Sequence, residues 1–138
     1  MSKKDFEVKC ELAALYRILH MYGMTDLANQ CAGARSSENK DNSFVHPYGM
    51  FYEEITASSL IKINKEGKAV DNNNPWLNDG CNNLAKWIFN ARDDVNFYVH
   101  GHANDVMAVG GTKEGLMYLS QAAVYLNHLI GYVDYEFV

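Results

Sequence analysis

The first helix is visible in the spacing of its apolar residues. Between residues 6 and 22 these residues recur at steps of four, three, four and three, which is the period of an amphipathic helix. They are Val8, Leu12, Leu15, Leu19 and Tyr22. Gly23 follows directly, and glycine accepts the left-handed conformation that ends many helices. The pattern predicts a helix that packs one stripe on the core and stops at Gly23.

Short segments with strand character come next. A uniformly polar run from 36 to 43 separates residues 31–35 from residues 44–46, and both flanking segments favour strands. Residues 54–60 are typical of one helical turn capped by Thr56, whose hydroxyl can accept from an amide two or three residues on. Ile61 and Ile63 alternate with polar residues before Glu66-Gly67. We therefore expect a third strand, a tight turn and a return at Val70.

The second half of the chain repeats the alternation of helices and strands. After a polar loop at 71–75, Asn78 or Asp79 can cap a helix whose apolar residues Leu84, Trp87, Ile88 and Ala91 keep helical spacing. Residues 95–100 alternate as a strand does, 120–130 favour a helix, and 132–137 an extended segment. Interleaved helices and strands predict a mixed α/β fold with helices covering a sheet, in one domain spanning 1–138.

Charge and composition exclude several classes of protein. The 138 residues carry 12 Lys and Arg against 17 Asp and Glu, a net charge of -5 with no basic stripe, so nucleic acid is not an expected partner. No apolar run reaches the roughly 18 to 20 residues of a membrane span, and the first residues do not form a signal-peptide core. Three widely spaced cysteines indicate free, buried thiols. We expect a cytoplasmic protein.

A pair of histidines carries the most chemical information. His100 and His102 are separated by Gly101, and alternate side chains of an extended chain share one face. Two imidazoles on one face can bind one metal ion, although catalytic zinc usually has three protein ligands. On spacing alone, two surface or hydrogen-bonded histidines remain the alternative.

Three blocks around this pair resemble one family. Residues 92–102, RDDVNFYVHGH, resemble the Arg, acidic, strand and His-x-His signature of the class II aldolases and the adducin head. Residues 46–60, HPYGMFYEEITASSL, look like that family's Pro-x-Gly and Glu-Ile-Thr block. Residues 116–121 with 131–136 are similar to its Leu-Ser-Gln and Asp-Tyr-Glu segment. The resemblance covers about residues 11–136 and favours His100 and His102 as metal ligands.

The resemblance implies a fold and a chemistry. The fold is a three-layer α/β/α sandwich with a central mixed, largely antiparallel sheet. Members include sugar-phosphate aldolases, epimerases and dehydratases, in which a zinc-type ion polarises a substrate oxygen and an acidic side chain moves protons. Sites between subunits of a homotetramer imply that this chain forms a homo-oligomer. The expected substrate is a small sugar phosphate or hydroxy-carbonyl compound.

Departures from the family pattern keep a second hypothesis open. The third metal-binding histidine of the enzymes would follow the Asp-Tyr-Glu block, so we expect a chain that lacks the family's C-terminal segment. Asn29-Gln30-Cys31 stands where phosphate-binding members have a Gly-Asn or Gly-His loop. The acidic residue nearest to the aldolases' glutamate is Asp79, which an N-cap role also explains. The alternative is a non-catalytic interaction domain of the adducin-head type, or a degenerate remnant; the catalytic residues stay unassigned.

Overall fold

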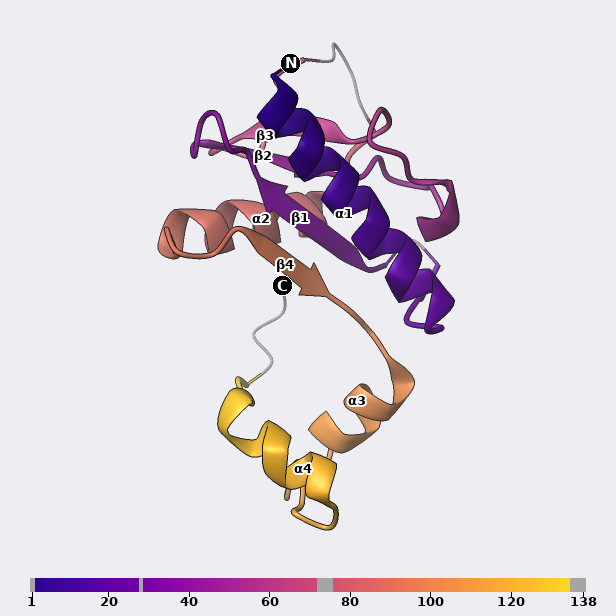
Figure 1. The fold of residues 1–138 in the computed structure, drawn as a ribbon. Helices are drawn as coiled ribbons and strands as arrows, with labels where there is room; N and C mark the ends of the chain where they lie inside the picture. The colour runs from indigo at the N-terminus through magenta and orange to yellow at the C-terminus, as the bar shows by residue number, and fades with distance from the viewer. Residues whose placement is uncertain (1, 28, 72–75, 135–138) are drawn as a thin grey trace. The chain divides into compact units, whose positions relative to one another are not determined.

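The computed structural model describes residues 2–27, 29–71 and 76–134 (Figure 1). These residues fall into two compact units, Met1–Gly101 and His102–Val138. The first unit contains α1 (Lys3–Met21), β1 (Cys31–Arg35), β2 (Asn42–Val45), the 3-10 helix η1 (Tyr52–Glu54), β3 (Ile61–Asn64), α2 (Asp79–Ala91) and β4 (Phe97–His100). The second contains α3 (Asn104–Gly110), α4 (Gln121–Leu126) and the 3-10 helix η2 (Asn127–Leu129). The prediction for residues 135–137 lies outside the described residues.

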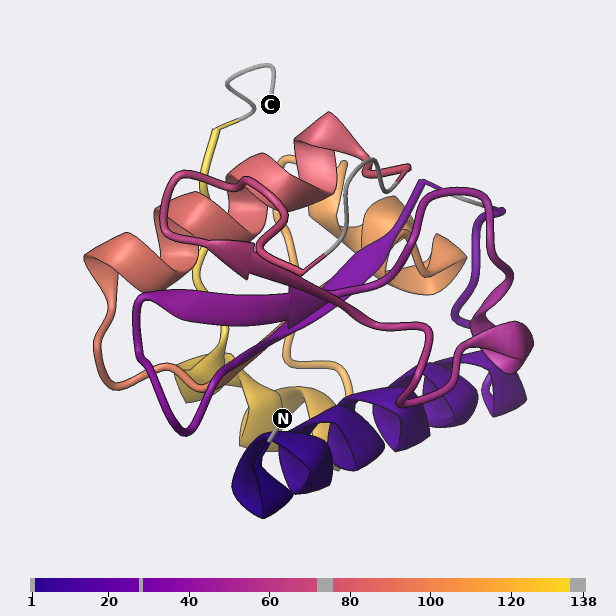
Figure 2. The same ribbon diagram turned by 90° about the horizontal axis from the view of Figure 1, so that it is seen from above.

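A four-stranded sheet forms the middle layer of the first unit. Its order is β3-β2-β1-β4, and every described pair of neighbours is antiparallel. Helices α1 and α2 lie on opposite sides of the strands (Figure 2). The unit therefore has the α/β/α layering that the sequence predicted, with a sheet whose described strand pairs are all antiparallel.

Strand β1 is buried on both faces along its whole length. Ala32 and Ala34 belong to the apolar cluster that includes α1, whereas Cys31 belongs to the cluster that includes α2. Successive strand residues point to opposite faces, so both helices pack on this one strand. A Cβ at Gly33 would overlap the ring of Tyr98, which lies opposite Gly33 in the β1–β4 register. Glycine at 33 is therefore required by the close approach of the Tyr98 ring.

Helix α1 ends as the sequence predicts. The Gly23 N–H donates to His20 O and the Met24 N–H donates to Leu19 O, both at 2.9 Å. Gly23 has φ 65°. These two bonds and the left-handed glycine form a Schellman motif, which satisfies carbonyls that the helix would otherwise leave open.

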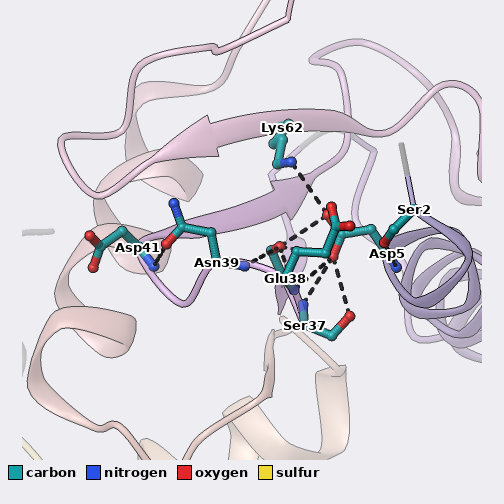
Figure 3. A network of polar contacts seen from close by, with 8 residues as sticks. Ser2, Asp5, Ser37, Glu38, Asn39, Asp41 and Lys62 are labelled. Carbon is teal, nitrogen blue, oxygen red and sulfur yellow. Dashed lines mark hydrogen bonds and ion pairs between the residues drawn. The ribbon is translucent and has the colours of Figure 1, made fainter.

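The N-terminal part of α1 is joined to the 36–39 turn by a buried carboxylate (Figure 3). Asp5 accepts from Ser36 Oγ at 2.8 Å and from the Ser37 N–H at 3.0 Å, and it pairs with Lys62 Nζ at 3.3 Å. Burial raises the pKa of Asp5, but the hydrogen bonds from Ser36, Lys62 and Glu38 outweigh burial and lower it below 3.8. A carboxylate with this many donors keeps its charge in the folded state.

Tyr16 and His46 form a second buried polar contact beneath α1. The Tyr16 hydroxyl accepts from the Ala32 N–H at 2.9 Å and donates to Ala32 O at 2.5 Å. With its proton used there, the hydroxyl accepts from His46 Nδ1–H at 2.8 Å. His46 Nε2 is buried and has no hydrogen-bond partner among the described residues. Burial lowers the pKa of His46 from 6.5 to about 4, so the ring is neutral near pH 7.

Helix α2 begins at one of the two predicted caps, and its buried face differs from the predicted stripe. Asn78 Oδ1 accepts from the Gly80 N–H at 2.9 Å and from the Cys81 N–H at 3.3 Å, so Asn78 is the N-cap. Trp87 is exposed, and Leu84 and Ile88 are only partly buried. The buried positions are Cys81, Asn82, Ala85 and Phe89. Apart from the Phe89 ring, the buried side chains of α2 are small, because Arg35 and Tyr98 occupy space between α2 and the sheet.

Arg35 joins β1 to the C-terminal end of α2. Its guanidinium donates to four backbone carbonyls at 2.8–3.0 Å, those of Lys40, Phe89, Arg92 and Val95. It also lies over the Phe89 ring, 4.7 Å from the centroid. Open carbonyls at a helix C-terminus carry partial negative charge, so they favour a cation there.

Strand β4 departs from the predicted alternation. The alternate apolar residues Phe97 and Val99 are 37% and 46% exposed, while Tyr98 between them is 7% exposed. Strand β4 is an edge strand, so β1 supports it on one side only. Tyr98 is buried because its ring covers Gly33 and its hydroxyl donates to Cys81 O at 3.0 Å.

One further prediction needs correction. Cys10 is exposed, unlike the buried Cys31 and Cys81. The helix predicted over residues 120–130 is present as α4 followed by η2, whereas α3 was not predicted. No residue of α3 is buried, and its seven residues are too few to show a sustained helical period in the sequence. Among the described residues, no helix combines the length and apolar character that a membrane crossing needs.

We expect Gly33→Ala to destabilise the fold. Adding a methyl group to a filled core forces the Tyr98 ring or β1 to shift, which costs about 1–3 kcal/mol of unfolding free energy. Urea unfolding followed by circular dichroism measures this change. Gly110→Ala is the matched control, because nothing lies within 4 Å of a Cβ at that helical glycine. Equal stability of the two variants would contradict the packing argument.

We also expect stability to fall on mild acidification because of His46. Unfolded His46 takes up a proton near pH 6.5 and folded His46 near pH 4. Stability is therefore full above pH 6.5 and decreases toward pH 4, by about 3 kcal/mol in total. Asp5 acts in a separate window, because its lowered pKa gives stability above about 3.8 that is lost only in stronger acid. Denaturant unfolding at a series of pH values measures the slope.

Two variants separate His46 from the other titrating groups. His46→Asn removes the titration, so its stability should change little between pH 6.5 and 4.5 after subtraction of any constant loss. His128→Asn changes an exposed histidine and should keep the wild-type slope. A wild-type slope in His46→Asn would assign the acid sensitivity to another group.

Candidate functional site

The predicted metal-binding pair lies at the end of β4. His100 is the last residue of this strand and pairs with Cys31 of β1, and it is partly buried. Gly101 and His102 follow outside the strand, and His102 is also partly buried. Strand alternation therefore does not extend to His102. The assignment of both imidazoles to one ion stays a prediction.

The other histidines occupy structural positions. His20 Nδ1 contacts Glu53 Oε2 at 3.1 Å, His46 is buried against Tyr16, and His128 is exposed on η2. Within residues 2–27, 29–71 and 76–134, no three His, Cys, Asp or Glu side chains gather as a metal-binding group. Catalytic zinc usually has three protein ligands, so the metal-binding role of His100 and His102 stays a prediction.

Gln30 lies beside the histidine segment. Its side chain is buried, and with its amide oriented to match its neighbours it donates to Met24 O at 2.9 Å and accepts from the Asp26 N–H. The amide lies 3.6 Å from where a Cβ of Gly101 would stand. Both ends of the Gln30 amide are used inside the 24–30 segment. The structure therefore gives Gln30 an internal role at the position of the family's phosphate loop.

Cys31, Cys81 and Tyr98 meet on the α2 side of this sheet end. Tyr98 Oη lies 3.8 Å from Cys31 Sγ, and Cys81 Sγ lies 3.8 Å from the Gln30 carbonyl. The hydrogen bond with Cys81 lowers the pKa of the Cys31 thiol despite burial. The same bond, followed by burial, raises the pKa of Cys81. No sequence pattern predicted this pair of thiols, because only the packing of α2 on β1 brings positions 31 and 81 together.

The acidic candidates do not form a proton-transfer couple. Asp79 is exposed and is the first residue of α2, so the N-cap role proposed for it is wrong and belongs to Asn78. Glu53 contacts His20, whereas Glu54 Oε2 accepts from the Phe51 N–H at 3.0 Å. The two glutamates therefore have different partners.

The blocks that carried the resemblance have local structural roles. Arg92 forms a bidentate pair with Asp94 at 2.8 and 2.7 Å, and this contact lowers the pKa of Asp94 to about 2. Thr56 Oγ1 accepts from the Ser59 N–H at 3.2 Å, which confirms the predicted capped turn. These contacts shape the turn before β4 and the turn before β3.

The second unit contains a cavity of about 330 Å³. Thr112, Lys113, Glu114 and Asp134 contribute polar groups to its wall, and Tyr132 Oη accepts from the Leu116 N–H at 2.6 Å beside it. The residues that line this cavity include neither histidine of the pair. The cavity and the predicted metal ligands are therefore separate features.

Comparison with known proteins decides the family. A family model described as the Class II Aldolase and Adducin N-terminal domain matches residues 10–137. The chain belongs to this family. The match runs through both compact units and includes His100 and His102.

Relatives come from both branches of the class II aldolase and adducin family. A Caulobacter vibrioides protein named "Putative aldolase class 2 protein" is 33% identical over 99% of this chain and 53% of its own length. Rat alpha-adducin is 34% identical over 94% of this chain and 18% of its own length. The chain thus spans about half the length of the aldolase-type relative.

Solved structures agree on the fold. An aldolase II superfamily protein from Pseudomonas syringae superposes with a TM-score of 0.93 at 30% identity, over 99% of this chain and 55% of that one. The L-fuculose 1-phosphate aldolase from Glaciozyma antarctica superposes with a TM-score of 0.80 at 23% identity, covering 90% of this chain and 51% of that chain. The second likeness shows the fold alone.

Proposed function

We propose that this chain is a metal-dependent lyase or isomerase domain of the class II aldolase type. His100 and His102 would hold a divalent, zinc-type ion, and the substrate would be a small sugar phosphate or hydroxy-carbonyl compound. The observation that supports this most directly is the pair of partly buried histidines within the family match, at and just after the end of β4. When bound, such an ion polarises a substrate carbonyl oxygen.

Two contacts within the chain position His100, the first of these proposed ligands. Pairing with Cys31 fixes the backbone of His100 at the end of β4, and Tyr98 secures this strand by covering Gly33. A ligand on a strand is positioned more rigidly than one on a loop. Two histidines give an incomplete set for catalytic zinc, so we propose weak metal binding from these two residues and leave the third ligand and the proton-transfer residue unassigned.

Metal titration tests this assignment. We expect zinc or cobalt to bind the wild-type chain, and His100→Ala or His102→Ala to weaken binding at least about 10- to 100-fold, because even indirect ligand partners contribute that much. Calorimetry measures the affinity. His128→Ala is the control, since it removes an exposed histidine on η2. Binding that both site variants leave unchanged would overturn the assignment.

Activity is tested on the same proteins. Retro-aldol assays with a panel of sugar phosphates, L-fuculose 1-phosphate included, should show turnover that depends on added metal and is lost in His100→Ala. Metal binding without turnover on any compound of the panel would favour the second candidate function.

That second candidate is a non-catalytic interaction domain of the adducin-head type or a degenerate remnant. It is supported by the 34% identity to rat alpha-adducin over 94% of this chain. Large apolar side chains of the second unit are also exposed, with Leu119 82%, Leu129 71% and Val133 90% accessible. A contiguous patch of such residues would mark an interaction surface.

Both candidate functions are compatible with a homo-oligomer, which we expect at micromolar concentration. Leu119→Ser combined with Val133→Ser should lower the mass measured by light scattering, because these substitutions remove exposed apolar area. Trp76→Ser changes an equally exposed residue of the first unit and serves as the control. A wild-type chain that is monomeric at every concentration tested would contradict self-association.

A further inference from the structure

Two buried thiols lie together between the sheet and α2. Cys31 is fully buried on β1 and Cys81 is 5% exposed in the first turn of α2. Both side chains belong to one buried cluster, and Cys81 Sγ lies 3.8 Å from the carbonyl of Gln30, the residue before Cys31. Positions 31 and 81 are far apart in sequence, so the fold has brought two oxidisable groups together at one point.

Tyr98 holds this pair in place. Its hydroxyl lies 3.8 Å from Cys31 Sγ and 3.0 Å from the Cys81 carbonyl, so it spans the strand that carries one thiol and the helix that carries the other. The Cys81 thiol also donates toward the Gln30 carbonyl at 3.8 Å. The approach of the Tyr98 ring depends on Gly33. Contacts on both elements therefore hold the two cysteines within one buried cluster.

We propose that Cys31 and Cys81 form a redox-responsive dithiol that a small peroxide closes into an intrachain disulfide. Such a bond would tie the first turn of α2 to the start of β1. The proposal is independent of the metal-dependent function, because it rests only on contacts within the first unit.

The chemistry balances with hydrogen peroxide as the oxidant. One thiolate attacks a peroxide oxygen, the O–O bond breaks, and the products are a sulfenic acid and, after protonation, water. The second thiol then attacks the sulfenic sulfur and releases a second water as the S–S bond forms. Two thiols lose two electrons and two protons, and one peroxide is reduced to two waters. Because both thiols are buried, the first step requires a local opening that admits the peroxide.

Cys10 provides a built-in comparison. It is exposed on α1, so it should react with an alkylating reagent in the native protein at least about 10-fold faster than the two buried thiols. Its exposure also allows disulfides between chains. The experiment therefore uses the full chain with Cys10→Ser, after confirming that its unfolding curve matches that of the wild type.

The test is peptide mapping of native protein treated with hydrogen peroxide. After quenching, the remaining thiols are alkylated in denaturant, and trypsin releases residues 18–35 with Cys31 and residues 69–86 with Cys81. We expect these two peptides to be linked, the linkage to disappear with dithiothreitol, and both thiols to be lost together from the alkylated pool.

A double variant and a denatured sample make the outcome decisive. Cys10→Ser with Cys81→Ser leaves Cys31 without a partner, so it should give no linked peptide and only singly oxidised sulfur. Linkage that forms only when peroxide is added to urea-denatured protein would overturn the proposal. So would native protein in which Cys31 and Cys81 stay reduced, or oxidise singly without joining.

Discussion

The burial of β1 on both faces is the constraint on which the rest of the first unit depends. A strand between two helices and two neighbouring strands leaves room only for small side chains or for large ones whose polar groups are paired. The residues Cys31, Ala32, Gly33, Ala34 and Arg35 meet this condition in different ways. The alanines let α1 approach, Gly33 admits a tyrosine ring, and Arg35 pairs with carbonyls.

Local sequence patterns were sufficient to predict the features that short-range contacts determine. The glycine stop of α1 and the turn capped by Thr56 were predicted and found, because each depends on neighbours within a few residues. The buried face of α2 was not predicted correctly, and the burial of Tyr98 on β4 was not predicted. Both are set by long-range packing around Tyr98 and Arg35, which apolar spacing does not record.

The candidate site shows the same difference between features that local sequence determines and features that long-range packing determines. The histidine pair was recognisable because its two members are close in sequence and lie in a block that resembles a family. The neighbours of His100 were not recognisable, since Cys31 reaches it through strand register and Gln30 lies near Gly101 only in the folded chain. Family membership is shown by the match over residues 10–137, whereas the reaction depends on side chains that the sequence pattern alone does not assign.

The contacts of Arg35 limit which substitutions position 35 can accept. Its guanidinium reaches four carbonyls from three stretches of chain, around Lys40, at the end of α2 and at Val95. A lysine has the same charge but presents its donors from a single nitrogen, so it cannot span these acceptors. Substitution there would leave several buried carbonyls without a donor. Position 35 should therefore accept fewer replacements among related sequences than its place outside the candidate site suggests.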